Sequence, residues 1–353
     1  MFALTYIGNT MEKLVSFGLS ILRSFSNYAD QCKTDDEQKN YEKDFVKCKQ
    51  EAEQGHSNAQ YNLARMYYYG EGIEQDKQKT VYWYTKAAEQ GHSIAQYYLA
   101  LVYDEGDGIP RDKQKAAFWY EKSAEQGYSS AQYDLASMYH AGDGIPQDEQ
   151  KAAYWYTKAA EQGYFSAQYH LALMYDLGDG IEQDKQKALY WYIKVAERGH
   201  SRAQNNLARM YDQGEGIEQD KEKAAYWYTK AAERGHSDAQ YNLAIMYSKG
   251  EGIKKDNQKA IYWYTKVAEQ GHCGAQYNLG SIYNNGDGIE KNKQKAIYWY
   301  TKAAEQNDPE AQYKLGIMYD KGDGVLQDKS LAKNYLKQSC NQGYKLACDE
   351  LKK

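Results

Sequence analysis

One four-residue stretch of the chain has residue types and spacing that could do covalent chemistry. Ser330-Leu331-Ala332-Lys333 matches the S-x-x-K element of serine β-lactamases and penicillin-binding proteins, whose serine is the nucleophile. The companion elements S-D-N and K-T-G are absent from the sequence, as is the motif G-x-S-x-G. Two fixed letters in four also arise easily by chance. A secreted protein of the β-lactamase or penicillin-binding type therefore stays an alternative, while we expect that the chain is not an enzyme.

Histidines and paired glycines recur at fixed intervals, which raises the questions of metal and phosphate binding. Five of the seven histidines follow a glycine at intervals of 36 residues or multiples of 36: His56, His92, His200, His236 and His272. Successive copies lie on the order of 15–20 Å apart if each repeat is a pair of packed helices, whereas zinc ligands lie about 2 Å from the metal. Gly70-Glu71-Gly72 lacks the third glycine of a dinucleotide-binding loop and has an acid at its centre. Both patterns indicate structural turns, so we expect no metal and no cofactor.

A 36-residue repeat organises the whole chain and positions these residues. Each of the seven tryptophans follows the previous one by 36 residues: Trp83, Trp119, Trp155, Trp191, Trp227, Trp263 and Trp299. A period of this length is typical of stacked supersecondary units, none of which can bury its apolar face alone. Eight full units follow one another, the first beginning at Ser57, and the eighth has Tyr335 in place of tryptophan. The sequence thus predicts an all-α solenoid of about eight helix-turn-helix repeats with end caps.

Each unit contains the signals of two helices, here called helix A and helix B. Ser57 and Gln60 have the spacing of a capping box at the start of helix A, and Gly70 is expected to end this helix. Asp76 is expected to cap helix B, and Gly91 to end it. Asn307 replaces the final glycine in one unit, and asparagine is the residue that best tolerates a left-handed conformation after glycine.

The periodicity also predicts which faces are buried. On helix A, positions equivalent to Ala59, Leu63 and Tyr67 share one side. On helix B, Trp83 and Tyr84 share a side with small residues. Small side chains let neighbouring helices approach while the large rings fill the gaps, so we expect this face of helix B to pack against neighbouring units.

These residues resemble a known repeat family. The pattern A-Q-x-x-L-A-x-x-Y-x-x-G-x-G-I-x-x-D over residues 59–76, followed by W-Y-x-K-A-A-E-x-G over residues 83–91, resembles the Sel-one-like repeat (SLR), a relative of the tetratricopeptide repeat. The resemblance covers roughly residues 40–350. It implies antiparallel helix pairs in a right-handed superhelix that serves as a protein-interaction scaffold. Members of the family are adaptors in endoplasmic-reticulum quality control, in the bacterial envelope and in contacts with hosts, which makes a host or envelope protein a possible partner.

The two ends of the chain differ from the repeats. Residues 1–35 do not repeat and contain a nine-residue mostly apolar run, which is interpreted as either a signal peptide or a capping helix. Residues 36–56 resemble a degenerate capping helix, residues 57–344 hold the eight repeats, and residues 345–353 form a half-repeat cap. The chain is expected to be either cytoplasmic or exported.

Five cysteines are few for 353 residues, and their odd number excludes complete intramolecular pairing. Free thiols that act as small apolar side chains are the simplest interpretation. Cys340 and Cys348 also resemble the cysteine pair in each repeat of a secreted, cysteine-rich bacterial branch of the family, and the resemblance implies a possible disulfide between them.

Charge and hydropathy argue against nucleic acid binding and against a membrane span. The formal charge is −5 and the pI is about 5.9, with basic and acidic residues interspersed, so we expect no nucleic acid. The mean hydropathy is −0.93, and no apolar run approaches the length of a membrane span, so we expect no stable membrane span.

The positions that vary between repeats suggest a binding surface. On helix A, positions equivalent to 58, 62, 65 and 69 form a stripe opposite the Ala/Leu/Tyr face, and this helix A stripe is expected to line a concave groove. Asparagines recur there and could hold the backbone of a peptide. The candidate residues are Asn62, Arg65, Ile94, Tyr98, Leu101, His170, Leu173, Arg202, Asn206, Arg209, Asn242 and Asn278. The main hypothesis is a scaffold or adaptor that binds a protein or peptide, and a self-assembling architectural protein is a further alternative.

Overall fold

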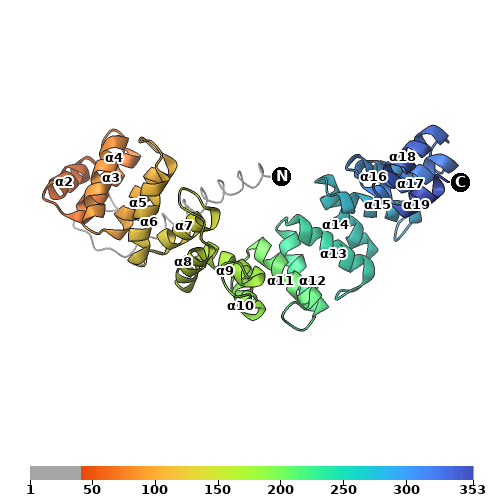
Figure 1. Cartoon of the computed structure of the whole chain (residues 1–353), viewed down its shortest axis with the longest axis horizontal. Helices are drawn as coiled ribbons and strands as arrows, with labels where there is room; N and C mark the ends of the chain where they lie inside the picture. Colours follow the sequence, from red (N-terminus) through yellow and green to blue (C-terminus); the bar gives the residue numbers. More distant parts are fainter. Residues whose placement is uncertain (1–40, 353) are drawn as a thin grey trace. The chain divides into compact units, whose positions relative to one another are not determined.

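The computed structural model describes residues 41–352, and within this range every regular element is an α-helix. The helices are numbered α2 to α19, and Figure 1 shows them in sequence order. Their bounds are α2 Tyr41–Glu53, α3 Ser57–Tyr69, α4 Lys77–Glu89, α5 Ser93–Glu105, α6 Lys113–Glu125, α7 Ser129–Ala141, α8 Glu149–Glu161, α9 Phe165–Leu177, α10 Lys185–Glu197, α11 Ser201–Gln213, α12 Lys221–Glu233, α13 Ser237–Lys249, α14 Asn257–Glu269, α15 Cys273–Asn285, α16 Lys293–Glu305, α17 Pro309–Lys321, α18 Lys329–Asn341 and α19 Lys345–Glu350. The predicted all-α repeat architecture is confirmed.

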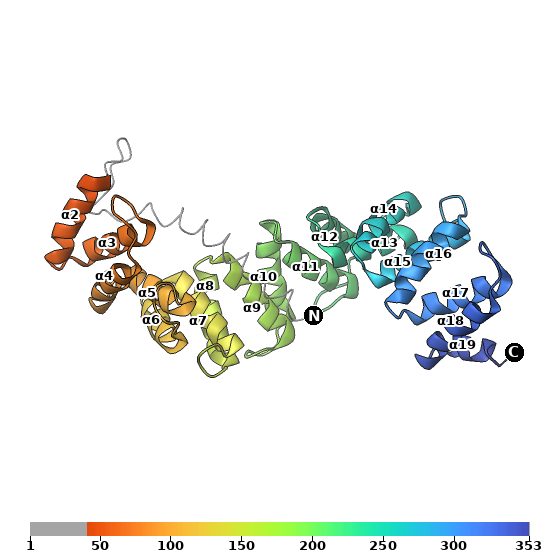
Figure 2. The same cartoon turned by 90° about the horizontal axis from the view of Figure 1, so that it is seen from above.

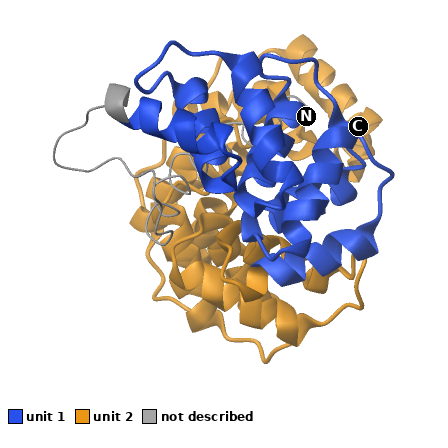
Figure 3. Cartoon of the chain, turned by 90° about the vertical axis from the view of Figure 1, so that its left-hand side faces the viewer, with its two compact units in different colours: residues 1–159 blue, residues 160–353 orange. Residues whose placement is uncertain are grey.

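The chain divides into two compact units, Met1–Ala159 and Ala160–Lys353, which Figure 3 shows in different colours. Within each unit a helix packs mainly on the helices directly before and after it, as α11 does on α10 and α12. Figure 2 shows this side-by-side stacking from a second direction. Helix A of each repeat is thus an odd-numbered helix from α3 to α17, and helix B is the even-numbered helix that follows it.

The ends of helix B form as the sequence predicts. Seven N-caps are aspartates and one is an asparagine, and each side chain accepts a hydrogen bond at 2.9–3.0 Å from the backbone amide three residues later. Beyond each of α4, α6 and α10 a glycine takes a positive φ, which ends the helix. Asn307 is the one non-glycine among the described residues with a positive φ, at 64°. Its role as a glycine substitute is confirmed.

The predicted capping box at the start of helix A is wrong, because the helix begins one residue earlier than this motif requires. In α5 the N-cap is His92, whose Nδ1 accepts from the backbone amide of Ala95 at 3.1 Å, and Ser93 is already helical. Gln96 is buried and donates to the carbonyl oxygen of Ala88 in the preceding helix B at 3.0 Å. The last turn of a helix leaves carbonyl groups without intrahelical partners, so this glutamine joins each repeat to the next.

Histidine has the same capping role in several repeats. His200, His236 and His272 also accept from the backbone amide three residues later, at 3.2–3.4 Å. Asp308 takes this place in the eighth repeat, with a distance of 2.7 Å. The regular spacing of the histidines therefore follows from the start of helix A in each repeat.

The core consists of small side chains, leucines and methionines, and its most deeply buried ring in each of the first seven repeats is a tyrosine of helix B. That ring belongs to the tyrosine after each tryptophan: Tyr84, Tyr120, Tyr156, Tyr192, Tyr228, Tyr264 and Tyr300 are at most 3% exposed. The tryptophans are only half-buried. The sequence pattern placed the tryptophan and the following tyrosine on the same side of helix B, whereas the helix packing buries only the tyrosine fully.

The C-terminal half-repeat is joined covalently to the last helix B. Cys340 in α18 and Cys348 in α19 form a disulfide with a Cα–Cα distance of 4.7 Å. The interpretation of the cysteines as free thiols is therefore wrong for this pair, whereas Cys273 in α15 is free. The interpretations made for residues 1–35 lie outside the described residues. No helix among residues 41–352 is long and apolar enough to cross a membrane.

Candidate protein-binding surface

The predicted stripe lies on helix A, and the structure distributes it over six helices. Asn62 and Arg65 lie on α3, Ile94, Tyr98 and Leu101 on α5, His170 and Leu173 on α9, Arg202, Asn206 and Arg209 on α11, Asn242 on α13, and Asn278 on α15. The first five belong to one compact unit and the other seven to the second. Arg202 is exposed, and the other eleven are half-buried. Much of the stripe therefore also contributes to packing.

In the first unit, Tyr98 is part of an aromatic cluster. Its ring stacks on Tyr84 at 5.8 Å, lies 5.9 Å from Tyr61 and meets Tyr97 edge-on at 5.4 Å. Burial is the main cause that raises the pKa of Tyr98 far above its usual value. Tyr98 is therefore a packing residue as well as a stripe residue, and its replacement is expected to lower stability.

Arg65, Leu101 and Ile94 complete the candidates of this unit. The guanidinium of Arg65 lies 3.3 Å from the carboxylate of Glu71, in the turn after its own helix. Leu101 packs against a cluster of buried residues from α5, α6 and α7. Each of the three side chains keeps part of its surface accessible.

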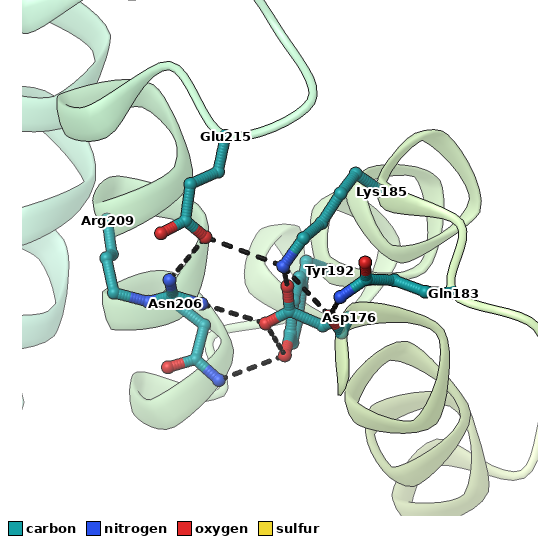
Figure 4. A network of polar contacts seen from close by, with 7 residues as sticks. All are labelled: Asp176, Gln183, Lys185, Tyr192, Asn206, Arg209 and Glu215. Atoms are coloured by element: carbon teal, nitrogen blue, oxygen red, sulfur yellow. Dashed lines mark hydrogen bonds and ion pairs between the residues drawn. The ribbon is translucent and has the colours of Figure 1, made fainter. Parts of the chain in front are cut away.

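In the second unit, a buried carboxylate organises the stripe. Asp176 in α9 is only 2% exposed, and Figure 4 shows the polar groups that surround it. Its Oδ2 accepts from the Arg209 guanidinium at 2.8 Å and from the Tyr192 hydroxyl at 3.2 Å, and Lys185 forms an ion pair with Oδ1. Glu215 bridges Arg209 and Lys185, with a distance of 3.6 Å to Lys185. The buried negative charge is thus matched by two cations and a hydroxyl, as a buried charge requires.

These contacts change the titration of the neighbouring groups. Burial, with the charge of Asp176 as a second cause, raises the pKa of Tyr192 far above its usual value. Burial alone would lower the pKa of Arg209, but the bond to Glu215 and the charge of Asp176 outweigh it and raise this pKa. Both residues therefore keep their protons at any physiological pH.

Eight stretches of the chain match the family model of the Sel1 repeat: residues 57–92, 93–128, 129–164, 165–200, 201–236, 237–272, 274–308 and 309–344. The chain belongs to the Sel1 repeat family. This result confirms the resemblance of the sequence motifs, and proteins of this family are generally non-enzymatic scaffolds for protein interactions.

Two solved structures show how far the likeness extends. The chain is 38% identical to c5321, a protective antigen of uropathogenic Escherichia coli with an SLR fold, with a TM-score of 0.77 over 87% of this chain and 66% of that chain. It thus spans just under two thirds of the length of that antigen. A Sel1 repeat protein from Oxalobacter formigenes is 29% identical, with a TM-score of 0.66 over 95% of this chain and 99% of that chain. The comparison with curated proteins gave no match.

The asparagines of this Sel1 repeat array contact tyrosine hydroxyls, of which those of Tyr192 and Tyr228 belong to core residues and that of Tyr241 to a half-buried one. Asn206 donates through Nδ2 to the Tyr192 hydroxyl at 3.2 Å, and Asn278 donates to the Tyr241 hydroxyl at 3.3 Å. A hydrogen bond from Asn242 acts on the Tyr228 hydroxyl in the same way. Buried hydroxyls need such partners, so the recurrence of asparagine has a structural cause, and the amide oxygens take no part in these bonds.

Sequence reasoning missed the acidic and basic pairs that join the two helices of a repeat. A carboxylate near the end of helix A meets the lysine nine residues later, in Asp104–Lys113, Asp176–Lys185, Asp212–Lys221 and Asp320–Lys329. The third repeat has His140 and Glu149 at these positions, 2.7 Å apart, so basic and acidic partners exchange places. This exchange within one chain was the signal in the sequence that could have revealed the pairs.

The most accessible apolar side chains of the helix A stripe lie at its C-terminal edge. Leu177 at the end of α9 is 69% exposed, and Tyr69 at the end of α3 is 43% exposed. His170 instead uses Nδ1 in a 2.8 Å contact with the carbonyl oxygen of Ser166 in its own helix. Leu177 and Arg202 are among the exposed stripe residues of the second unit.

The S-x-x-K motif lies on the surface of the last helix B. Ser330 and Lys333 are both exposed in the first turn of α18. This turn is capped by Asp328, which accepts from the backbone amide of Leu331 at 2.9 Å, as the equivalent residue does in the other repeats. The repeat geometry accounts for the turn without a catalytic role.

Proposed function

We propose that the chain is a non-catalytic scaffold that binds a protein or peptide through the accessible part of the helix A stripe. The observation that carries the proposal is the exposure of Leu177, an apolar side chain that is 69% accessible on a stripe whose chemistry changes from repeat to repeat. The positions that stay constant, such as those of Ala167 and Leu171, are buried. Packing accounts for the constant positions, so the variable stripe is free to select a partner.

Two exposed stripe residues on α9 and α11 differ in chemistry. Leu177 lies at the C-terminal end of α9, and Arg202 lies exposed at the N-terminal end of α11. A guanidinium binds carboxylates with two parallel hydrogen bonds. A segment with an apolar side chain at one end and an acidic side chain at the other therefore fits this surface, in a host or an envelope protein.

The asparagines supply contacts that do not depend on the partner's sequence. The amide oxygens of Asn206 and Asn278 are not used in the bonds to tyrosine, and they are the groups that accept from the backbone amides of a bound segment. Variable side chains then give selectivity, while the asparagines hold the backbone.

The test is affinity capture from the native host, followed by binding measurements with the captured protein. Leu177→Asp combined with Arg202→Glu is expected to weaken binding at least tenfold, about 1.4 kcal/mol. The control is Glu218→Ala with Lys254→Ala, two exposed changes on loops of the same unit. Circular dichroism checks that both variants are folded. Binding that resists the stripe variant, or that is lost in the loop variant, would contradict the proposal.

A further inference from the structure

A second surface, on helix B, is exposed and nearly identical in seven repeats. Four positions of each helix carry lysine, an aromatic residue, lysine and glutamate, and in the second unit all of them are exposed. We call these sixteen residues of the second unit the helix B face: Lys187, Tyr190, Lys194 and Glu197 on α10; Lys223, Tyr226, Lys230 and Glu233 on α12; Lys259, Tyr262, Lys266 and Glu269 on α14; Lys295, Tyr298, Lys302 and Glu305 on α16. The four tyrosines are 50–54% exposed.

Packing within the chain does not account for these aromatic side chains. In α10 the buried residues are Ala188, Tyr192, Val195 and Ala196. Tyr190 stays exposed: it meets the edge of the adjacent tryptophan ring at 5.1 Å, and the Lys194 ammonium lies 4.5 Å from its ring centroid. Exposed aromatic groups that recur in a row mark interaction surfaces. In the first unit the equivalent residues, Tyr82, Phe118 and Tyr154, are also 50–54% exposed.

The four positions change together. In the eighth repeat they hold Leu331, Asn334, Gln338 and Asn341, so the charges and the aromatic ring are lost at once. The buried alanine of helix B persists there as Ala332, and the helix still forms. The four residues of the face therefore change as a group, and the helix forms without them.

The chemistry of the face is symmetric about its centre. In α10, Lys187 and Glu197 lie five residues on either side of Tyr192, and Tyr190 and Lys194 lie two residues on either side. At a rise of about 1.5 Å per residue, an antiparallel copy of the helix places lysine opposite glutamate about 7.5 Å from the centre on each side. The same overlay places each tyrosine ring opposite a lysine, which favours a cation–π contact.

We propose that the helix B face is a self-association surface through which two copies of this chain pair in an antiparallel, two-fold symmetric contact. In such a contact each pair of residues occurs twice, so the symmetry of the face is used in full. A two-fold axis that runs along the row of helices sets each helix against its own counterpart in the second copy. Four helices with five exposed residues each supply 20 residues a side, about the size of a standard interface.

A hollow beside Tyr226 supports this assignment. It measures about 320 Å³ and is lined by Glu222, Tyr226 and Lys230 from α12 and by Gly252 and Ile253 from the loop between α13 and α14. Ala225 forms part of its wall, where the neighbouring repeats have the larger Leu189 and Ile261. The hollow gives a side chain from the facing helix a place to insert.

The test measures the mass of the full chain by sedimentation and light scattering over a wide range of concentration. The mass is expected to rise from 40.6 kDa, the value for one chain, toward that of a dimer. In the two-fold contact α12 faces α12 of the second copy and α14 faces α14, so K223E with K259E places glutamate opposite Glu233 and Glu269. This variant is expected to stay monomeric, and so is E233K with E269K.

The decisive arm mixes the two variants. Each repels itself, but the glutamates of one now face the lysines of the other, so the mixture is expected to regain the dimer mass with at least tenfold tighter association than either variant alone. High salt is expected to weaken both this heterodimer and the wild-type dimer. Circular dichroism checks that each variant folds. A wild type that remains at the mass of one chain, a dimer that survives in the single variants, or a mixture that stays monomeric overturns the proposal.

Discussion

Arg209 and Asp176 join the first helices of two successive repeats, with 2.8 Å between the guanidinium nitrogen and the buried carboxylate oxygen. Arg209 lies on the helix A stripe, and Asp176 occupies a position beside the stripe that also varies between repeats. The differences between repeats at these two positions have therefore produced an internal ion pair, and not only differences in the exposed side chains. Because a buried carboxylate without partners is costly, the cation fixes how α11 lies on α9 in this unit.

Replacement of the buried carboxylate is expected to lower stability strongly. Asp176→Ala leaves Arg209 and Lys185 with Glu215 as their remaining acidic partner and removes the acceptor of Tyr192. The loss of one member of a buried ion pair costs about 3–5 kcal/mol. Urea unfolding followed by circular dichroism measures this change.

The matched control is Asp320→Ala, at the equivalent position of the eighth repeat. Its partner Lys329 lies at 2.8 Å, but the carboxylate is 40% exposed. An exposed pair contributes about 0–1 kcal/mol. If the two variants unfold at the same urea concentration, the buried network does not stabilise the unit.

Three consecutive aromatic residues of α10 are expected to differ widely in their contributions to stability. Tyr190 is 50% exposed, Trp191 is half-buried, and Tyr192 is fully buried at 0%. Truncation of a buried large aromatic residue costs about 3–5 kcal/mol, whereas surface changes lie within about ±0.5 kcal/mol. The order of melting temperatures is therefore expected to be Tyr190→Ala above Trp191→Ala above Tyr192→Ala. A lower melting temperature for the tryptophan variant than for Tyr192→Ala would assign the core to the tryptophans.

Local signals in the sequence were sufficient to predict the helices and many of their ends. Asp184 caps α10, and Asn307 takes a left-handed conformation, because these choices depend on a few neighbouring residues. The capping box failed because Gln96 has two possible partners, its own helix start and the carbonyl of Ala88 in the preceding helix. That choice depends on how the repeats stack, which no local rule contains.

The same limit applies to the candidate site. Trp191 and Tyr192 are adjacent on one helix, and only the position of the neighbouring helices decides that Tyr192 is the buried ring. The periodic pattern placed Arg209 and Leu177 together on one stripe, but it did not show that Arg209 bonds to Asp176 while Leu177 stays exposed. Asp176, an acid outside the predicted stripe, draws Arg209 into an internal ion pair, whereas Leu177 stays on the surface.

Acid is expected to destabilise the second unit through its capping histidines. His200 accepts from the amide of Ala203 through Nδ1, and burial, with Arg202, His170 and His236 as weaker causes, lowers its pKa to about 4. An unfolded histidine has a pKa of about 6.5, so below this pH the unfolded chain binds a proton that the folded chain does not. The contribution of His200 to stability is therefore complete above pH 6.5 and is lost as the pH falls toward 4. The pKa of His236 is lowered in the same direction.

The variant that tests this titration is His200→Asn, because asparagine caps a helix without binding a proton in this range. Urea unfolding at several pH values between 7 and 4 is expected to show a smaller loss of stability in the variant than in the wild type. His56→Asn is the control, since His56 forms no capping bond through its side chain. Equal pH dependence in the wild type and His200→Asn would mean that the cap does not titrate.

The disulfide between Cys340 and Cys348 is expected to hold the final half-repeat on α18. It closes a short loop, with a sequence separation of 8 residues, so it removes about 2–3 kcal/mol of loop entropy from the unfolded state. Helix α19 spans only Lys345–Glu350 and packs on α18 alone among its strong contacts, so it has little other support. Reduction, or Cys348→Ser, is therefore expected to raise amide hydrogen exchange in α19 and at the end of α18, while α10 and α12 stay protected. Cys273→Ser is the control for the loss of a thiol. Exchange in α19 that is unchanged by reduction would show that packing alone secures this end of the array.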